Sequence, residues 1–150
     1  MKIILFLLIS IFSFQAFTSI YEVEFFFTAD DRDTDVMKFT DLITLRQFKG
    51  KANWKDNKGN YGVVECMGNH TIFKNKKTLL KMYCKEINKS NDNFVLMFDR
   101  NSENYSAGVG ESIYIDAIGK YSKYKSLKCI YAVNSFEDKG SIIKQKCKLN

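Results

Sequence analysis

The spacing of the four cysteines limits the fold of this 150-residue chain more than any other feature. Cys66 and Cys84 are 18 residues apart, and the same interval separates Cys129 from Cys147. The midpoint of each pair falls in a short polar segment of the kind that forms turns. We therefore expect two β-hairpins, each with its two cysteines opposite one another. Four cysteines allow three pairings, and the pairing within each hairpin is the one that we predict.

The second of these hairpins has a clear two-residue period around a turn at residues 137–140. With its cysteines opposite one another, Tyr131 faces Gln145 and Val133 faces Ile143 on the same side of the hairpin. The other side carries three lysines, Lys144, Lys146 and Lys148. The hairpin would therefore have one solvent-exposed face and one largely apolar face, as expected of two strands in a sheet that covers a hydrophobic core.

The first hairpin would turn at residues 74–77. Its cysteine face would carry three further cross-strand pairs, Gly68–Met82, His70–Leu80 and Ile72–Thr78. On the other face the same register places Glu65 opposite Lys85, which is a favourable charge pair. A bulge in either turn would shift the register by one residue.

The first residues of the chain are typical of a secretory signal peptide. Lys2 precedes an apolar run over residues 3–14 that is too short to span a membrane, and the small residues Ala16 and Thr18 follow it. We expect cleavage after Thr18, so residues 1–18 would be the signal peptide and 19–150 a single domain. A buried N-terminal strand or an uncleaved anchor is the alternative. No later segment is apolar enough for a transmembrane span, so we predict a secreted or periplasmic protein, where cysteines pair.

The rest of the chain consists of short strand candidates separated by turn-forming residues. They span residues 21–27, 36–45, 61–73, 78–87, 94–100, 111–118, 127–136 and 141–149. The second of these strands could continue as far as Trp54. Residues 41–49 could instead form a short helix. The pattern predicts an all-β fold, either a barrel or a sandwich. We prefer an antiparallel up-and-down barrel of about eight strands, stapled by two disulfides, because closure leaves no exposed sheet edge.

Several short motifs follow one another from Trp54 onward. They are Trp54-x-Asp56-Asn57-x-Gly59-Asn60-Tyr61-Gly62, Cys66-Met67-Gly68, Gly119-Lys120-Tyr121 and Leu127-Lys128-Cys129-Ile130-Tyr131. In this order they resemble small secreted bacterial β-barrel proteins with a calycin-like or allene-oxide-cyclase-like barrel. The resemblance implies a barrel and carries no common activity, because a fold alone does not define a function.

One dense acidic cluster lies at residues 30–35, in which Asp31, Asp33 and Asp35 alternate. This spacing suits a calcium loop, but Val36 and Leu42 occupy the positions that need glycine and glutamate. We expect a solvated loop, with weak calcium binding as the alternative. Residues 21–43 carry seven acids and two bases, so a contact between the acidic loop and a basic face of the protein is a further expectation. The cysteines lack the close spacing of zinc ligands, and we predict no metal and no cofactor.

The segment over residues 119–128 alternates lysines with tyrosines. We predict a polyanion-binding face there, formed by Lys120, Tyr121, Lys123, Tyr124, Lys125 and Lys128. The net charge of +6 is too small for a dedicated nucleic-acid binder, so the expected partner is an anionic envelope component. The alternative is a solubilising loop whose tyrosines pack against the rim of the barrel.

The register of the first hairpin points His70 into the barrel together with Leu80 and Met82. With Trp54, these residues form our predicted binding site for a small apolar or amphipathic ligand. A structural, hydrogen-bonded histidine is the alternative for His70. Because neither an acid–base pair nor a nucleophile set can be assembled from the spacing, we predict no catalytic residues, and a barrel enzyme of unknown reaction is the third hypothesis.

Overall fold

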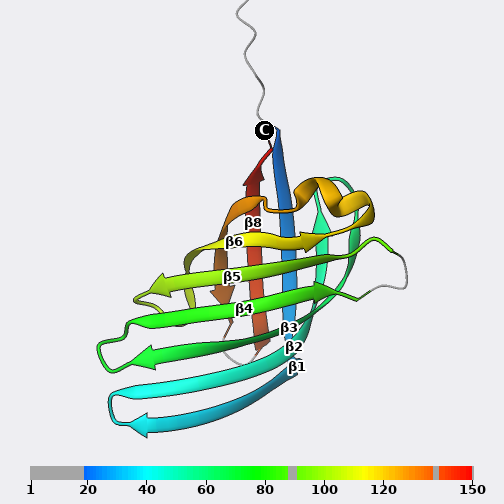
Figure 1. Cartoon of the computed structure of the whole chain (residues 1–150). Coiled ribbons are helices and arrows are strands. Elements are labelled where there is room, and N and C mark those ends of the chain that lie inside the picture. Colours follow the sequence, from blue (N-terminus) through cyan, green and yellow to red (C-terminus); the bar gives the residue numbers. More distant parts are fainter. Residues whose placement is uncertain (1–18, 88–90, 137–138, 150) are drawn as a thin grey trace, which may run out of the picture.

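The computed structural model describes residues 19–87, 91–136 and 139–149, with the side chains of residues 29–33 outside the description. The chain forms one closed barrel of eight antiparallel strands in sequence order (Figure 1). The strands are β1 (Ile20–Thr40), β2 (Ile43–Asp56), β3 (Tyr61–Phe73), β4 (Thr78–Glu86), β5 (Phe94–Ser102), β6 (Ala107–Ala117), β7 (Lys128–Ser135) and β8 (Gly140–Lys148). This confirms the predicted all-β, up-and-down barrel. The signal peptide predicted over residues 1–18 lies outside the described residues.

The first strand closes the barrel. Its N-terminal half pairs with β8, from Ile20 opposite Lys148 to Thr28 opposite Gly140. Its C-terminal half pairs with β2 alone, as far as Thr40 opposite Ile43. The β1–β2 hairpin therefore projects beyond the closed part of the barrel, as Figure 1 shows. Closure satisfies the backbone groups that an open sheet would leave at its edges.

One expectation and one alternative near this hairpin were wrong. Residues 30–35, expected to form a loop, belong to β1, whose register with β2 shifts between Phe27 and Arg32. Residues 43–49 are part of β2 and not of a helix. The pairing of β2 with strands on both sides provides more backbone hydrogen bonds than a short isolated helix could, so tertiary pairing overrides the local preference.

Both disulfide-bonded hairpins have the predicted register. Cys66 lies opposite Cys84 and Cys129 opposite Cys147, and each pair forms a disulfide. Glu65 is opposite Lys85 as expected. Its carboxylate, however, forms an ion pair with Lys49 on the other neighbouring strand, at 3.2 Å. A residue in a central strand has neighbours on both sides, and the hairpin register alone considers only one of them.

The 3-10 helix η1 (Gly119–Tyr124) covers one end of the barrel (Figure 1). The Tyr124 ring stacks on Tyr21, with centroids 4.3 Å apart, and the Tyr121 ring meets Trp54 edge-on at 6.0 Å. Both helix tyrosines are buried. This end of the barrel is therefore filled by aromatic side chains. They stabilise it through the apolar surface that they bury and through favourable geometry between the rings. We call these four rings the aromatic plug.

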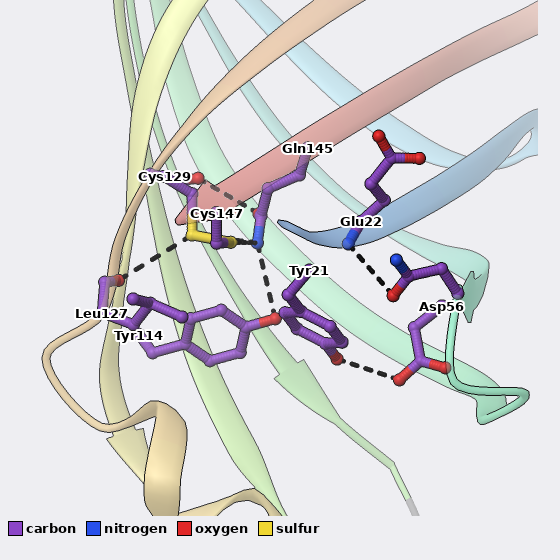
Figure 2. The surroundings of a disulfide bond; sticks show 10 residues. Tyr21, Glu22, Asp56, Tyr114, Leu127, Cys129, Gln145 and Cys147 are labelled. Carbon is purple, nitrogen blue, oxygen red and sulfur yellow. Dashed lines mark hydrogen bonds between the residues drawn. A yellow bond between two sulfur atoms is a disulfide. The ribbon is translucent and has the colours of Figure 1, made fainter. Parts of the chain in front are cut away.

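Buried polar groups beside the second disulfide are paired. The Gln145 amide nitrogen donates to the Tyr114 hydroxyl at 3.4 Å and approaches the Cys147 sulfur at 3.3 Å (Figure 2). The Gln145 amide oxygen accepts a hydrogen bond from Ser112 at 3.1 Å. A buried amide satisfied in this way does not need a ligand, so this part of the interior is structural.

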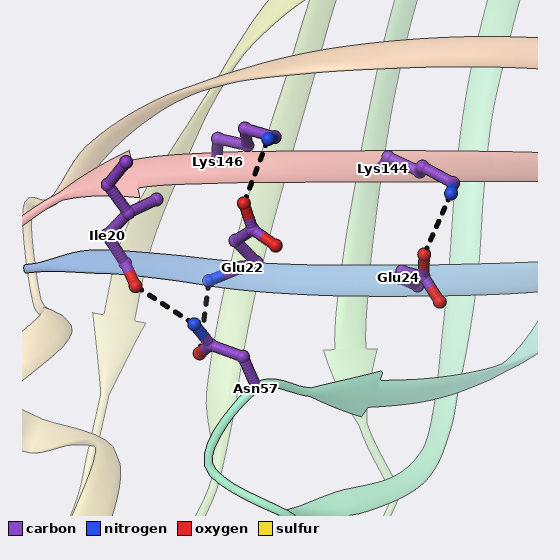
Figure 3. Close-up of polar contacts among 6 residues, drawn as sticks. All are labelled: Ile20, Glu22, Glu24, Asn57, Lys144 and Lys146. Carbon is purple, nitrogen blue, oxygen red and sulfur yellow. Dashed lines mark hydrogen bonds and ion pairs between the residues drawn. The ribbon is translucent and has the colours of Figure 1, made fainter.

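Ion pairs on the outer wall join the first and last strands. Glu22 meets Lys146 at 2.9 Å and Glu24 meets Lys144 at 3.1 Å (Figure 3). The hydrogen bond from Lys144 lowers the pKa of Glu24. Solvent-exposed pairs of this kind contribute little to stability, about 0–1 kcal/mol each. These two glutamates lie outside the acidic cluster of residues 30–35, so the contact expected between that cluster and a basic face stays a prediction.

Candidate functional site: a cationic cavity at the open end

A cavity of about 100 Å³ lies in the barrel at the end opposite η1. Its lining includes Tyr105 from the β5–β6 turn and Ser135 and Ser141, which flank the β7–β8 turn. In an up-and-down barrel these turns share the end at which the β1–β2 and β3–β4 hairpins also turn. The remaining lining residues are Phe27, Thr34, Arg46, Phe48, Gly50, His70, Leu80, Met82, Arg100, Val133 and Ile143.

Four of the lining residues form one continuous row across β2, β3, β4 and β5. Arg46 pairs with His70, His70 with Leu80, and Leu80 with Arg100. Directly opposed residues point to the same face of a sheet, and this face is the interior. The fold therefore directs two arginines and a histidine into the same cavity.

The Arg100 guanidinium is the most buried charged group of the site. The residue is 3% exposed. Its Nη2 donates to the Tyr105 carbonyl oxygen at 2.9 Å, whereas Nε and Nη1 have no hydrogen-bond partner among the described residues. Burial lowers the pKa of Arg100. Guanidinium groups do not lose their proton in proteins, so the N–H groups of these two nitrogens remain available for an acceptor.

The second arginine approaches the same tyrosine from another strand. Arg46 Nη1 donates to the Tyr105 hydroxyl at 3.4 Å, and its guanidinium carbon lies 5.1 Å from the centre of the tyrosine ring. Its Nε is buried without a hydrogen-bond partner among the described residues. Both arginines thus keep unused donors while Tyr105 holds their positions.

His70 is neutral in this environment. The residue is 5% exposed, its ring is stacked on Tyr105, and its Nε2 has no hydrogen-bond partner in the described part of the chain. Burial, with added repulsion from Arg100 and Arg46, lowers the pKa of His70 to about 4. The two arginines therefore carry the positive charge of the cavity at neutral pH, and His70 contributes polarity without charge.

Apolar side chains form much of the remaining lining. They are Phe27, Phe48, Leu80, Met82, Val133 and Ile143. None of the described lining residues is acidic. The cavity thus combines one buried and one partly buried cation with a hydrocarbon wall, which fits a ligand that has an anionic group and a small apolar part.

Gly108 leaves the space that Arg100 occupies. A Cβ at this position would lie 3.3 Å from both Cδ and Nη1 of Arg100. This distance is shorter than an ordinary van der Waals contact. A larger residue on β6 would therefore displace the guanidinium from its position.

Three of the four residues predicted to bind a ligand come together in this cavity. His70, Leu80 and Met82 all line it. The structure does not bring Trp54 to them, because its indole packs in the core toward η1, edge-on to Phe94 at 5.2 Å. Trp54 is fully buried and belongs to the filled end of the barrel.

The residues predicted to bind polyanions are divided between the surface and the core. Tyr121 and Tyr124 are 2% and 3% exposed and belong to the aromatic plug. The lysines of the segment lie on the exterior, where Lys120 donates to the Asn60 side chain at 3.0 Å and Lys125 pairs with Asp116 at 2.9 Å. Lys123 and Lys128 are also exposed. The ammonium groups of Lys120 and Lys123 lie over the rings of Tyr121 and Tyr124, at 5.0 and 5.1 Å from the ring centres, so these tyrosines are covered and present no exposed ring to a ligand.

Sequence reasoning missed Arg46 and Arg100. Arg100 continues the alternating series Phe94, Leu96 and Phe98, all of which are buried. An arginine in phase with the apolar face of a strand is a signal that the sequence does contain. Arg46 shares its face with Phe48 in the same way. The meeting of the two arginines in one cavity depends on the register of β3 and β4, which lie between their strands.

The acidic cluster gives no site in the described part of the chain. The side chains of residues 30–33 lie outside the description, and Asp35 is exposed on β1. No group of three or more potential metal ligands is found among the described residues. The calcium alternative for this cluster stays a prediction.

Comparison with protein-family models, with curated proteins and with solved structures finds no match to this chain. Within the described ranges, no helix is long and apolar enough to cross a membrane.

Proposed function

We propose that the protein binds a small amphipathic anion in the cationic cavity. The observation that carries this proposal is the buried guanidinium of Arg100, which has two nitrogens without a described partner. A buried charge without a counter-ion is costly, and natural proteins rarely retain one without a compensating interaction. An anion placed between Arg100 and Arg46 would satisfy these donors by charge-assisted hydrogen bonds.

The apolar wall determines the second half of the ligand. Hydrocarbon against Phe48, Leu80 and Met82 would be removed from water, which stabilises binding by about 25 cal/mol per Å² of apolar surface. The cavity of about 100 Å³ has room for a few atoms beyond the anionic group, and a longer chain would extend through the open end. A short alkyl sulfate or carboxylate has this chemistry.

Binding without catalysis agrees best with the state of His70. Its pKa of about 4 makes it a weak base at neutral pH, and its Nε2 has no hydrogen-bond partner among the described residues. General acid–base catalysis works best with a pKa near the working pH and with a partner in hydrogen-bond reach. We therefore place His70 in the role of a neutral polar wall of the binding site.

The location that we propose is outside the reducing cytosol. Two disulfides join neighbouring strands of the barrel, and no cysteine of the chain remains free. Such bonds persist in secreted and periplasmic proteins and are reduced in the cytosol. The signal-peptide pattern of residues 1–18 supports the same location.

The experiment compares three probes of equal chain length by isothermal titration calorimetry: hexyl sulfate, hexanol and hexylamine. We expect hexyl sulfate to bind at least about tenfold more tightly than hexanol, because only the anion accepts charge-assisted hydrogen bonds. Hexylamine should not bind. Equal affinities for hexyl sulfate and hexanol would contradict the proposal.

A pair of variants assigns the binding to the cavity. Arg100→Met removes the buried cation and should abolish the preference for hexyl sulfate. Lys51→Met removes one cation from the exposed outer face of β2 and should leave the affinity unchanged. Retained anion preference in Arg100→Met would place the site elsewhere. The lysine segment over residues 119–128 stays a separate prediction, now resting on its lysines alone because its tyrosines are buried.

A further inference from the structure

Large apolar side chains are exposed together on the two projecting hairpins beside the open end of the barrel. We call this surface the hairpin patch. It consists of the exposed residues Met37, Phe39, Leu42 and Leu79 and of Leu45 and Phe73, which are partly buried. Met37, Phe39 and Leu42 are more than half exposed, and Leu79 is 40% exposed. The core is filled by other residues, so these side chains do not contribute to it.

The register places much of the patch on the outer face. Met37 is opposite Leu45, and Leu45 is opposite Thr71, which in turn faces Leu79. The adjacent row contains Arg46 and points into the cavity. Because successive residues of a strand point to opposite faces, the row of Met37, Leu45 and Leu79 points outward.

A backbone contact joins the two hairpins at their turns. The Leu42 carbonyl accepts a hydrogen bond from the backbone nitrogen of Lys74 at 2.9 Å. Ile43 also lies opposite Phe73. The turns of β1–β2 and β3–β4 therefore lie next to each other, and both hairpins project on the same side of the barrel in Figure 1.

Lysines surround the hairpin patch. Lys38, Lys74, Lys76 and Lys77 are exposed in the two hairpins, and none forms an ion pair with a described residue. Among the side chains that the structure describes there, the exposed aspartates are Asp35 and Asp41, against four lysines. The surroundings of the apolar patch are therefore basic, and the complementary partner is anionic.

We propose that the hairpin patch docks on the surface of an anionic lipid bilayer. Apolar side chains would enter the boundary between headgroups and acyl chains, while the lysines would contact anionic headgroups. A second copy of the chain would bring the lysines of both patches together, and this repulsion disfavours a dimer.

Docking of this kind would place the open end of the barrel, and with it the cationic cavity, next to the bilayer. The docking surface and the cavity use different faces of the same strands, so each proposal stands without the other. A protein that fails to bind hexyl sulfate could still bind vesicles, and the two failures are distinguishable.

Vesicle flotation tests the proposal with the disulfide-bonded protein of residues 19–150. The probes are vesicles of phosphatidylcholine alone and vesicles with 30 mol% phosphatidylglycerol. We expect flotation with the anionic vesicles at low salt, about tenfold or more above that with neutral vesicles, and a steep decline as salt is added. No flotation with the anionic vesicles would overturn the proposal.

Two variants and their matched controls locate the contact. Phe39→Ser combined with Leu42→Ser removes apolar side chains from the patch, and the control makes the same changes at Val109 and Ile130, which are exposed on the outer wall. We expect the patch variant to lose binding by about tenfold or more and the control to float like the unchanged protein. Equal loss in both variants would overturn the assignment to the patch.

A second comparison tests the charge. Lys38→Gln, Lys74→Gln and Lys77→Gln together should reduce flotation on the order of 10–100-fold. The control carries the same net change at the other end of the barrel, at Lys58, Lys85 and Lys148, which are exposed and lie outside the lysine segment, and it should retain binding. An equal loss in the control would mean that net charge, and not the hairpin patch, determines binding, and our proposal would be wrong.

Sedimentation equilibrium distinguishes a lipid surface from a second copy as the occupant. We expect a monomer at concentrations up to about 100 µM, where a specific dimer would have formed. A dimer that the Phe39→Ser, Leu42→Ser variant dissociates would overturn the proposal, because the patch would then be an interface between copies. Circular dichroism of every variant should match the unchanged protein, since all the substituted side chains are exposed.

Discussion

The imidazole of His70 lies nearly parallel to the ring of Tyr105, with centroids 4.5 Å apart and an angle of 18° between the planes. Tyr105 also accepts hydrogen bonds from Arg100 and Arg46, through its carbonyl and its hydroxyl. One residue of the β5–β6 turn thus positions the three nitrogen-containing side chains of the cavity. The loop contributes the contact point, and the strands supply the rigid support.

The stacked histidine predicts a pH dependence of stability. The folded-state pKa of His70 is about 4, below the value of about 6.5 expected in the unfolded chain. Between these values the unfolded state binds more protons, so the stabilisation is complete above pH 6.5 and is lost as the pH falls through 4. The free energy of unfolding should drop with a slope of at most about 1.4 kcal/mol per pH unit.

The matched variant for this prediction is His70→Phe, which keeps a flat ring against Tyr105 and removes the titration. Urea unfolding of both proteins between pH 4 and 7 isolates the contribution of His70, because the carboxylates titrate in both. We expect the difference in unfolding free energy to change over this range. A constant difference would mean that the pKa of His70 is not lowered.

The buried Arg100 predicts a trade-off between stability and binding. Arg100→Met replaces a buried cation, which lacks a described counter-ion, by an apolar side chain of similar length. The lost hydrogen bond to Tyr105 costs about 1 kcal/mol, and removal of the buried charge stabilises by more than that. The free energy of unfolding without ligand should rise by about 1 kcal/mol, measured in urea, while anion binding disappears. A loss of about 2 kcal/mol or more would show that Arg100 is stabilised in the free protein.

Each disulfide closes a loop of similar length and should contribute similarly to stability. The cysteines of each pair are 18 residues apart, which corresponds to about 3 kcal/mol by the chain-entropy estimate. Replacing Cys66 and Cys84 together by alanine should lower the free energy of unfolding by about this amount, and so should the same change at Cys129 and Cys147. Intact mass should rise by four hydrogens on reduction of the unchanged protein. A smaller mass gain would contradict two disulfides.

The aromatic plug predicts that the tyrosines of η1 matter for stability and its lysines do not. Tyr124→Ala removes a buried ring stacked on Tyr21 and should cost about 3–5 kcal/mol. Lys123→Ala lies one residue away on the exposed side and should change the free energy of unfolding by less than about 0.5 kcal/mol. Thermal unfolding of the two variants provides the comparison. Similar melting temperatures would mean that η1 does not close the barrel.

Local patterns predict the hairpins correctly. The interval between the cysteines, together with the two-residue period, is enough to place His70 beside Leu80 and Met82 on the inner face. This works because a hairpin joins neighbouring strands through a short turn, so its register depends on a few adjacent residues.

Local patterns fail where the neighbour is distant in the chain. The sequence of β1 contains an acidic cluster that indicates a loop, yet pairing with β2 extends the strand through it. The Lys/Tyr segment indicates a surface for ligands, yet its tyrosines turn inward because the end of the barrel under η1 needs aromatic side chains to fill it. In both cases tertiary packing outweighs the local preference.

The sequence by itself determined the fold class, the number of strands, the two disulfides and the inner face of the first hairpin, since all of these follow from short-range periodicity and spacing. Only the tertiary structure decided which residues share the cavity. Arg46 and Arg100 are 54 positions apart in the chain, and they meet because β2, β3, β4 and β5 are in register across the barrel. The position of Arg46 relative to Arg100 depends on the registers of three successive strand pairs and on any bulge in them. A local sequence pattern does not contain this information.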